Sequence, residues 1–387
     1  MPSGEQLAVA LKGTTGSIAA PPILDLSALA VRIAILQPDV VLLSVRGPLV
    51  RVVVRAIVGA SVARPVNVSG LPGISIPATK RAIAHRAQVD SFVLHSRREV
   101  REFEELATSM GIDMPFGLAT LPFLPRRACP QKTRGRTQNG KVIFVTQAKV
   151  PAGRADRLAL LGRLAESARR HPYLRVVVRV RAARGEHQSH AGRHDYADLM
   201  DELQPRAPDN LVVAGGAMSD HLGGAGLVTM SSTAAIEAIA LWVPVIIVDD
   251  FGVSAELINT VFEDPGLFGN CGDLVEGRFH HPNAACLDDN YFRGAEQNDW
   301  VRRVDELLST RTTGNLPLKP LRHGDFGGVL RRAWDPTRAL GRYDRSWSGV
   351  LALTVGTPVR WGWMVVRGTR SRRSCVRLAN AETIGGQ

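Results

Sequence analysis

The chain is poor in cysteine and has no apolar run long enough to cross a membrane. Its 387 residues include four cysteines and no C-x-x-C pair, which excludes a disulfide framework and a cysteine zinc site and predicts a reducing compartment. The longest apolar stretch, Ile236–Val248, contains Glu237 and Pro244 and falls short of the roughly 18 residues of a transmembrane helix. The first residues lack the basic start and apolar segment of a signal peptide. We therefore expect a cytoplasmic protein and leave open a peripheral contact with the inner face of the membrane.

Several catalytic signatures are also missing. There is no P-loop, no G-x-S-x-G elbow and no G-x-G-x-x-G at a strand–helix turn, which excludes Walker NTPases, α/β-hydrolases and most dinucleotide enzymes. The Asp-Phe-Gly at residues 250–252 lacks the H-R-D loop and Val-Ala-Ile-Lys strand of a protein kinase. The histidines have no convincing metal-ligand spacing, so we expect no metal site.

Lysine is scarce, and the positive charge is concentrated at one end of the chain. Lys and Arg exceed Asp and Glu by 12, yet only six of the 48 basic residues are lysines. Residues 321–387 hold 12 arginines and 4 acidic residues, so this tail supplies +8 of the net +12. The rest of the chain is only mildly basic, and we do not expect a nucleic-acid partner. A non-catalytic polyanion-binding protein that works through the tail remains an alternative.

Apolar, β-rich runs alternate with amphipathic stretches, which predicts an α/β fold with parallel strands. We expect helices that include Arg97–Met110 and Asp156–Arg170. The expected strands are Val40–Leu43, Val66–Ser69, Ser91–Leu94, Val142–Val145, Arg175–Val180, Asn210–Val213, Leu227–Met230 and Val245–Val248.

A polar, basic segment rich in turn formers, Pro122–Gly140, is typical of an inter-domain linker. It predicts a first α/β domain at 1–135, a second at 136–320 and a basic extension at 321–387. Because residues 1–20 contain no opening strand and glycine turn, we expect the first βα unit to be missing.

Three hydroxyl residues, Ser231, Ser232 and Thr233, lie between a buried strand and a helix. The first turn of such a helix presents free amide groups and the positive end of its dipole, which suit a phosphate. Glu237 lies one turn further on and can accept ribose or sugar hydroxyls. The alternative is an ordinary N-cap with a dipole-favoured surface acid.

A second group of polar residues follows the strand that starts at residue 175. Arg179 and Arg181 share one face at its exit, where they can clamp a diphosphate, and Gln188 and His190 lie in the loop beyond. An edge strand with solvated arginines is an equal alternative. Asp250 follows the strand beside the phosphate site and is a candidate catalytic acid, with a plain acidic turn as the alternative.

The first predicted domain also places polar and glycine residues after its strands. Ser69, Gly70 and Gly73 belong to a glycine–proline loop where backbone can approach a ligand closely, although a simple turn is commoner. His95 and Ser96 end the next strand. His95 is a candidate proton carrier by type and position, with a hydrogen-bonded structural histidine as the alternative.

The second domain resembles the donor-binding half of GT-B glycosyltransferases, and in particular bacterial capsule-type and sialyltransferase-like enzymes. Their Ser-Ser/Thr motif matches Ser231–Thr233, followed by Glu237 and the strand entry Val243–Val245. The chain from about residue 35 to 275 also resembles an actinobacterial family of proposed glycosyltransferases, through Ser-Gly-Leu-Pro-Gly-Ile, His-Ser-Arg-Arg-Glu, Gln-Ser-His and Asp-Phe-Gly-Val.

The resemblance implies two Rossmann-like domains facing a cleft, an N-terminal acceptor-side domain at 1–135 and a nucleotide-sugar donor domain at 136–320. It also implies transfer of a sugar from a nucleotide-activated donor to a hydroxyl of a glycan or lipid-linked acceptor. The pathway would be cell-surface glycan synthesis, the transfer hexosyl or sialyl, and the nucleotide sugar a co-substrate, with no cofactor. Sialyltransferase-like enzymes carry a His-Pro pair after the arginine-rich strand, whereas His171-Pro172 precedes it here, which leaves His190 as the nearest general acid. A non-hydrolysing nucleotide-sugar 2-epimerase ranks second, because its Asp-Ser-Gly-Gly segment is replaced by Thr-Met-Ser-Ser-Thr.

Overall fold

The computed structural model divides the chain into two compact units. It describes residues 22–121, 123–124, 139–147, 150–180, 194–216, 218, 221–263, 266–283, 287–317, 319, 328–344, 346–356 and 358. The first unit contains Met1–Pro21, Gly70–Lys80 and Ser91–Glu306, and the second contains Pro22–Ser69, Arg81–Asp90 and Leu307–Gln387. The linear domain boundaries at residues 135 and 320 stay predictions.

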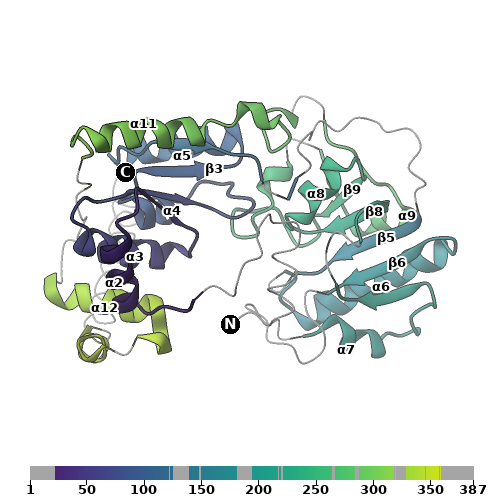
Figure 1. The fold of residues 1–387 in the computed structure, drawn as a ribbon. Coiled ribbons are helices and arrows are strands. Elements are labelled where there is room, and N and C mark those ends of the chain that lie inside the picture. The colour runs from purple at the N-terminus through teal and green to yellow at the C-terminus, as the bar shows by residue number, and fades with distance from the viewer. Residues whose placement is uncertain are drawn as a thin grey trace, which may run out of the picture. The chain divides into compact units, whose positions relative to one another are not determined.

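A six-stranded sheet forms the centre of the first unit (Figure 1). Its strand order is β10-β9-β8-β5-β6-β7, and the paired strands run parallel. The register places Val145 of β5 opposite Arg179 of β6, so these strands end at the same edge. The strands are β5 (Asn139–Val145), β6 (Arg175–Arg179), β7 (Leu211–Ala214), β8 (Gly224–Thr229), β9 (Val245–Val248) and β10 (Phe268–Gly269).

A smaller four-stranded sheet has the order β1-β2-β3-β4. Its strands are β1 (Val40–Leu43), β2 (Val66–Gly70), β3 (Ser91–Leu94) and β4 (Phe116–Leu118). The pairs β1–β2 and β3–β4 are parallel. Together the two sheets confirm the α/β class with parallel strands.

Helices connect the strands, as parallel crossovers require. In α5, the Ser96 hydroxyl accepts the Glu99 amide and the Glu99 side chain accepts the Ser96 amide, which is the capping box that starts this helix. The helices are α2 (Leu26–Leu36), α3 (Gly47–Ala60), α4 (Lys80–Arg86), α5 (Arg97–Ser109), α6 (Arg154–Arg170), α7 (Tyr196–Asp201), α8 (Ala234–Ala240), α9 (Cys271–Glu276), α11 (Trp300–Thr312) and α12 (Gly328–Leu340).

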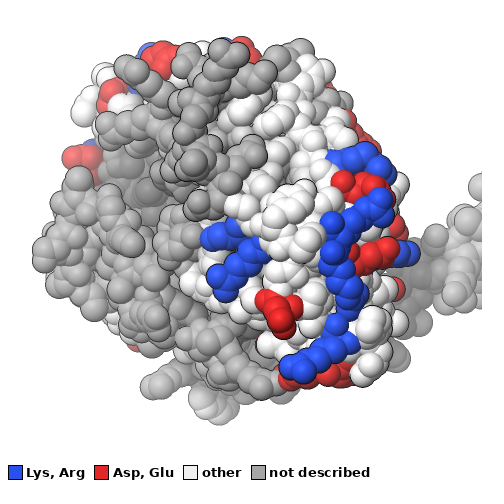
Figure 2. All heavy atoms as spheres, turned by 90° about the vertical axis from the view of Figure 1, so that its right-hand side faces the viewer, with Lys and Arg blue, Asp and Glu red and all other residues white. Residues whose placement is uncertain are grey.

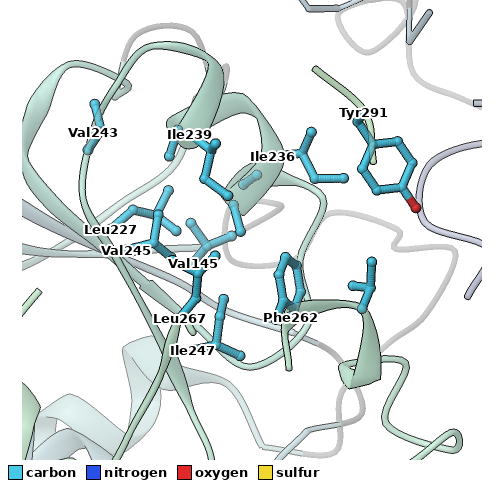
Figure 3. Close-up of a cluster of buried hydrophobic side chains, with 14 of the residues drawn as sticks. Val145, Leu227, Ile236, Ile239, Val243, Val245, Ile247, Phe262, Leu267 and Tyr291 are labelled. Atoms are coloured by element: carbon cyan, nitrogen blue, oxygen red, sulfur yellow. The ribbon is translucent and has the colours of Figure 1, made fainter. Parts of the chain in front are cut away.

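Both faces of the six-stranded sheet are buried. Along β5, Val142 and Phe144 pack in one apolar cluster, whereas Ile143 and Val145 pack in another, because successive side chains point to opposite faces. Helices α6, α7 and α9 contribute to the first cluster. Helix α8 contributes Ile236 and Ile239 to the second cluster, which Figure 3 shows together with Val145, Val245 and Ile247 of the strands. This two-sided burial explains the continuous apolar runs of the strand sequences.

The sequence predicted the longer elements well. The strands starting at Val40, Ser91 and Val245 have the predicted bounds, and the other predicted strands are confirmed with ends shifted by up to three residues. The predicted helices are confirmed as α5 and α6. Strands β4 and β10 were not predicted, because runs of three and two residues show no periodicity.

Arginines on the surface of the first unit are largely paired with acids. Arg163 lies 2.9 Å from Glu166, Arg170 lies 3.0 Å from Glu276, and Arg278 lies 2.8 Å from Asp273. Figure 2 shows basic and acidic side chains interleaved on one face of the molecule. This local pairing fits the mildly basic body that the composition predicted. No helix in the described ranges has the length and apolar character to cross a bilayer.

Candidate functional site

The carboxyl edge of the six-stranded sheet gathers polar side chains from neighbouring strands. Thr146 follows β5, and its hydroxyl donates to the carbonyl oxygen of Arg179 at the end of β6 (3.0 Å). The Thr229 hydroxyl at the end of β8 donates to the Val145 carbonyl (3.2 Å). In open α/β sheets ligands bind beyond this edge. The carboxyl ends of β5, β6 and β8 therefore form the candidate site.

Gln147 makes two hydrogen bonds to Ser231 through the nitrogen and the oxygen of its side-chain amide. Its Nε2 donates to Ser231 Oγ (2.7 Å), and the Ser231 amide donates to Gln147 Oε1 (2.9 Å). The side chain therefore fixes the loop after β8 to the loop after β5. Sequence reasoning missed Gln147, although it comes two residues after a strand, and a position near the end of a strand is the signal that selected other site residues.

The next two residues lead into α8. Thr233 is the N-cap, and the Ser232 hydroxyl accepts the Ala234 amide (3.2 Å). The alternative interpretation, an ordinary helix N-cap, is therefore correct in that Thr233 occupies the cap position and Ser232 accepts an amide of the first turn. Within the described part of the chain, the amides of Ser232 and Thr233 have no hydrogen-bond partner, whereas the Ser231 amide is occupied by Gln147. These two amides thus lie next to three hydroxyl groups, of which those of Ser231 and Ser232 already accept a hydrogen bond and can still donate one.

Glu237 of α8 lies within the electrostatic influence of Arg179 of β6. Burial raises the pKa of the half-buried Glu237 carboxyl above its ordinary value, and the positive charge of Arg179 opposes that rise. Arg179 Nη2 also donates to the Gly216 carbonyl after β7 (2.9 Å). The predicted residues Arg179, Ser231, Ser232, Thr233 and Glu237 therefore come from β6, the turn after β8, and α8, at one edge of the sheet.

The glycine–proline loop of the first unit contacts the same turn. Gly73 has a φ of +72°, and a Cβ added to it would lie 2.6 Å from Thr233 Cγ2. A Cβ added to Gly70 would lie 3.3 Å from the Val93 carbonyl oxygen. Both glycines therefore allow a close backbone approach, as predicted, and the group that Gly73 approaches is the methyl of Thr233.

His95 holds this loop in place through both ring nitrogens. Nε2 lies 2.7 Å from the Leu71 carbonyl oxygen and Nδ1 lies 3.0 Å from the Ala119 carbonyl oxygen. An imidazolium can donate to both carbonyls, whereas either neutral tautomer can donate to only one. These contacts are those of the structural histidine considered above, and the proton-carrier role of His95 stays a prediction.

Glu99 is buried and joins the glycine–proline loop to the end of β3 and to Tyr291. Its carboxylate accepts hydrogen bonds from the amides of His95 (2.8 Å) and Ser75 (2.8 Å), and from the Tyr291 hydroxyl (2.7 Å). Burial raises the pKa of Glu99, and the hydrogen bonds and the charge of His95 oppose the rise. The Ser96-x-x-Glu99 spacing could have revealed the capping box, but nothing local in the sequence points to Tyr291.

A family model described as "Putative glycosyltransferase (DUF6716)" matches residues 1–307. The chain belongs to this family. That membership confirms the glycosyltransferase resemblance and places the chain among enzymes of the transferase kind. No curated protein matches the sequence.

Solved structures share the fold of this glycosyltransferase-family chain at low identity. The UDP complex of MnaA from S. aureus is 10% identical and has a TM-score of 0.50, with 83% of this chain and 88% of that chain covered. UGT89C1 from Arabidopsis thaliana is 14% identical with a TM-score of 0.45, and the match covers 74% of this chain and 78% of that chain. The GT-B-like α/β fold class is confirmed.

The remaining predicted site residues of this family member fall into two groups. Arg181, Gln188 and His190 lie outside the described residues. Asp250 is exposed after β9, and its Oδ2 accepts the Cys271 amide (2.7 Å).

Two predicted serines of the acceptor-side loop are buried. Ser69 donates to the Leu43 carbonyl oxygen (3.0 Å) and accepts from Arg86 Nε (3.2 Å), so its hydroxyl has partners inside the protein. Ser96 caps α5. Among the residues that the structure describes, no three His, Cys, Asp or Glu side chains cluster as metal ligands would.

Proposed function

We propose that this chain transfers a sugar from a nucleotide-activated donor to a hydroxyl acceptor. The observation that carries the proposal, beside family membership, is the polar group at the carboxyl edge of the six-stranded sheet. There Arg179 and Glu237 lie at the same edge as the turn that Gln147 fixes through Ser231. A cation, amides without a hydrogen-bond partner among the described residues, and a carboxylate are groups that can bind a sugar nucleotide.

The proposed roles follow from the chemistry of each group. The amides and hydroxyls of Ser232 and Thr233, with the Ser231 hydroxyl, donate to the donor phosphate. Arg179 adds positive charge as the leaving phosphate becomes more negative during transfer. The half-buried Glu237 carboxylate accepts hydrogen bonds from ribose or sugar hydroxyls. Arg181 and Gln188 are further proposed donor ligands.

The acceptor is proposed to approach the loop that contains Gly70 and Gly73. It would be a hydroxyl of a glycan or a lipid-linked sugar, in cell-surface glycan synthesis. Asp250, His95 and His190 are the proposed proton carriers. Of the two that the structure describes, Asp250 is exposed, whereas both ring nitrogens of His95 lie within hydrogen-bond distance of carbonyl oxygens.

Isothermal titration with UDP-, GDP- and CMP-sugars tests donor binding. We expect one nucleotide class to bind. The Ser231→Ala/Ser232→Ala variant should then bind about tenfold or more weakly, since a hydrogen bond to a charged group contributes about 1.5–3 kcal/mol and 1.4 kcal/mol is tenfold. The matched control is Ser109→Ala, an exposed serine near the end of α5, which should bind as the wild type does. The proposal is rejected if no sugar nucleotide binds, or if the Ser231→Ala/Ser232→Ala variant binds as tightly as the Ser109→Ala control.

The products separate transfer from the alternative of epimerisation. A transferase releases the nucleotide when a hydroxyl acceptor is supplied, whereas a 2-epimerase changes the sugar and keeps the nucleotide attached. Chromatography of the nucleotide together with NMR of the sugar distinguishes the two. Formation of the epimer without an acceptor would replace the transferase proposal.

A further inference from the structure

A short helix in the second unit, residues 347–356, turns its small residues inward. Gly349 and Ala352 are buried. A Cβ added to Gly356 would lie 3.1 Å from Trp334 of α12, and one added to Gly349 would overlap the Thr337 hydroxyl of the same helix. The small side chains therefore let this helix pack closely against α12.

On the opposite side of the helix, four apolar side chains are exposed beside the exposed Thr354. Trp347, Val350, Leu351 and Val355 are 80%, 56%, 50% and 50% exposed. Val350, Leu351 and Val355 follow Trp347 by three, four and eight positions, which puts all four residues on one side of the helix. We call these four residues the outer apolar face. Globular proteins usually put polar residues there, so an apolar stripe in this position marks an interaction surface.

The charged residues that follow this helix in the sequence are all basic as far as residue 381. Residues 346–359 contain no charged residue, and no acidic residue occurs from 346 to 381. Six arginines follow within that span, at positions 360, 367, 370, 372, 373 and 377, with tryptophans at 361 and 363. An apolar helix face with neighbouring arginines and tryptophans has the composition of a segment that lies in the interface of an anionic membrane.

A second copy of the chain is a poorer occupant than a membrane. A two-fold interface pairs the same segment of both copies, and the sequence from 346 to 381, with six arginines and no acidic residue, offers its copy no opposite charge. Like charges at such a contact repel, whereas anionic lipid headgroups attract them.

We propose that the outer apolar face docks the protein on a membrane surface that contains anionic lipids. The apolar side chains enter the boundary between headgroups and acyl chains, and the arginines attract the anionic headgroups. The helix lies in the plane of the interface, so the attachment is peripheral. This inference does not depend on the proposed sugar transfer.

Sedimentation of the full chain with vesicles tests the proposal. The vesicles are phosphatidylcholine alone and phosphatidylcholine mixed with phosphatidylglycerol. We expect binding to the mixed vesicles and much weaker binding to the neutral ones. Trp347→Ser/Leu351→Ser/Val355→Ser should weaken binding to the mixed vesicles at least about tenfold, because each apolar side chain contributes on insertion. The matched control is Val62→Ser, which changes a 96% exposed apolar residue outside this helix and should bind as the wild type does.

Circular dichroism and thermal unfolding of the triple variant check that it folds, which the exposure of all three positions predicts. No binding to the mixed vesicles overturns the proposal. So does equal binding by wild type and the triple variant, because the arginines alone would then explain it. Light scattering gives the remaining outcome: a wild-type dimer that the triple substitution converts to a monomer, without vesicle binding, would assign the face to a second copy instead.

Discussion

The Tyr291 hydroxyl donates a hydrogen bond to Glu99 Oε1 across 2.7 Å, although the two residues lie 192 positions apart in the sequence. The same oxygen accepts the Ser75 amide (2.8 Å), and Oε2 accepts the His95 amide (2.8 Å). Glu99 thus joins the glycine–proline loop, the end of β3 and the segment after α9. This carboxylate fixes the loop whose Gly73 contacts Thr233.

We expect Tyr291→Phe to lower the free energy of unfolding by about 1–3 kcal/mol. The substitution removes a donor from a buried carboxylate, and a buried group left unsatisfied costs about that much. Burial and Glu99 raise the pKa of Tyr291 well above 10.0, so its hydroxyl remains protonated and donates throughout the usual pH range. Urea unfolding measures the change. Tyr173→Phe, which alters an exposed tyrosine, should change stability by less than about 0.5 kcal/mol. Equal effects of the two substitutions would contradict the assigned role of Tyr291.

The raised pKa of Glu99 predicts a pH dependence of stability with a definite sign. Between its ordinary value of 4.5 and the raised value, the folded state binds more protons than the unfolded state. The contribution of Glu99 to stability is therefore greatest below pH 4.5 and declines as pH rises through the raised pKa. Glu99→Gln cannot titrate. We expect the stability of the wild type relative to this variant to fall over that interval in unfolding curves. A difference that stays constant, or grows with pH, would show that burial does not dominate at Glu99.

The sequence predicted the elements whose signals are local. The apolar runs of β1 and β9 and the helical spacing in α5 gave correct positions, because each depends on neighbouring residues. The pairing of Tyr291 with Glu99 depends on how distant segments pack, and no periodicity encodes that. Gln147 was missed for a different reason: its importance lies in a cross-loop contact with Ser231. Residues that follow strands could be proposed from the sequence, whereas their partners required the structure.

Gly73→Ala should destabilise the protein more than Gly111→Ala. Both glycines have positive φ, +72° and +60°, where an alanine is strained by roughly 1–2 kcal/mol. A Cβ at Gly111 meets nothing within 4 Å, whereas one at Gly73 would meet the Thr233 methyl at 2.6 Å. The difference between the two variants in thermal unfolding therefore isolates the contact with Thr233. Donor affinity should fall in Gly73→Ala alone. Identical losses of stability would mean that this contact is absent in solution.

Glu237 should make donor binding pH-dependent. Burial raises its pKa above 4.5, and only the ionised carboxylate leaves both oxygens free to accept hydroxyl hydrogen bonds. Donor affinity should therefore fall as pH is lowered through that raised pKa. Glu237→Gln should bind about tenfold more weakly at neutral pH and show a flatter profile in calorimetric titration. Glu166→Gln, an exposed glutamate paired with Arg163, is the control and should keep the wild-type profile. A Glu237→Gln profile as steep as that of the wild type would place the titrating group elsewhere.

The central claim is that a sugar nucleotide binds at the carboxyl edge of β5, β6 and β8. Hydrogen–deuterium exchange of the full chain, with and without the sugar nucleotide that binds best, tests it most directly. The account predicts slower exchange of the amides at Ser232 and Thr233 and in the peptide that contains Gln147, with little change in α2 and α3. Protection that avoids the turn from Met230 to Thr233, in a chain that demonstrably binds the nucleotide, would contradict it.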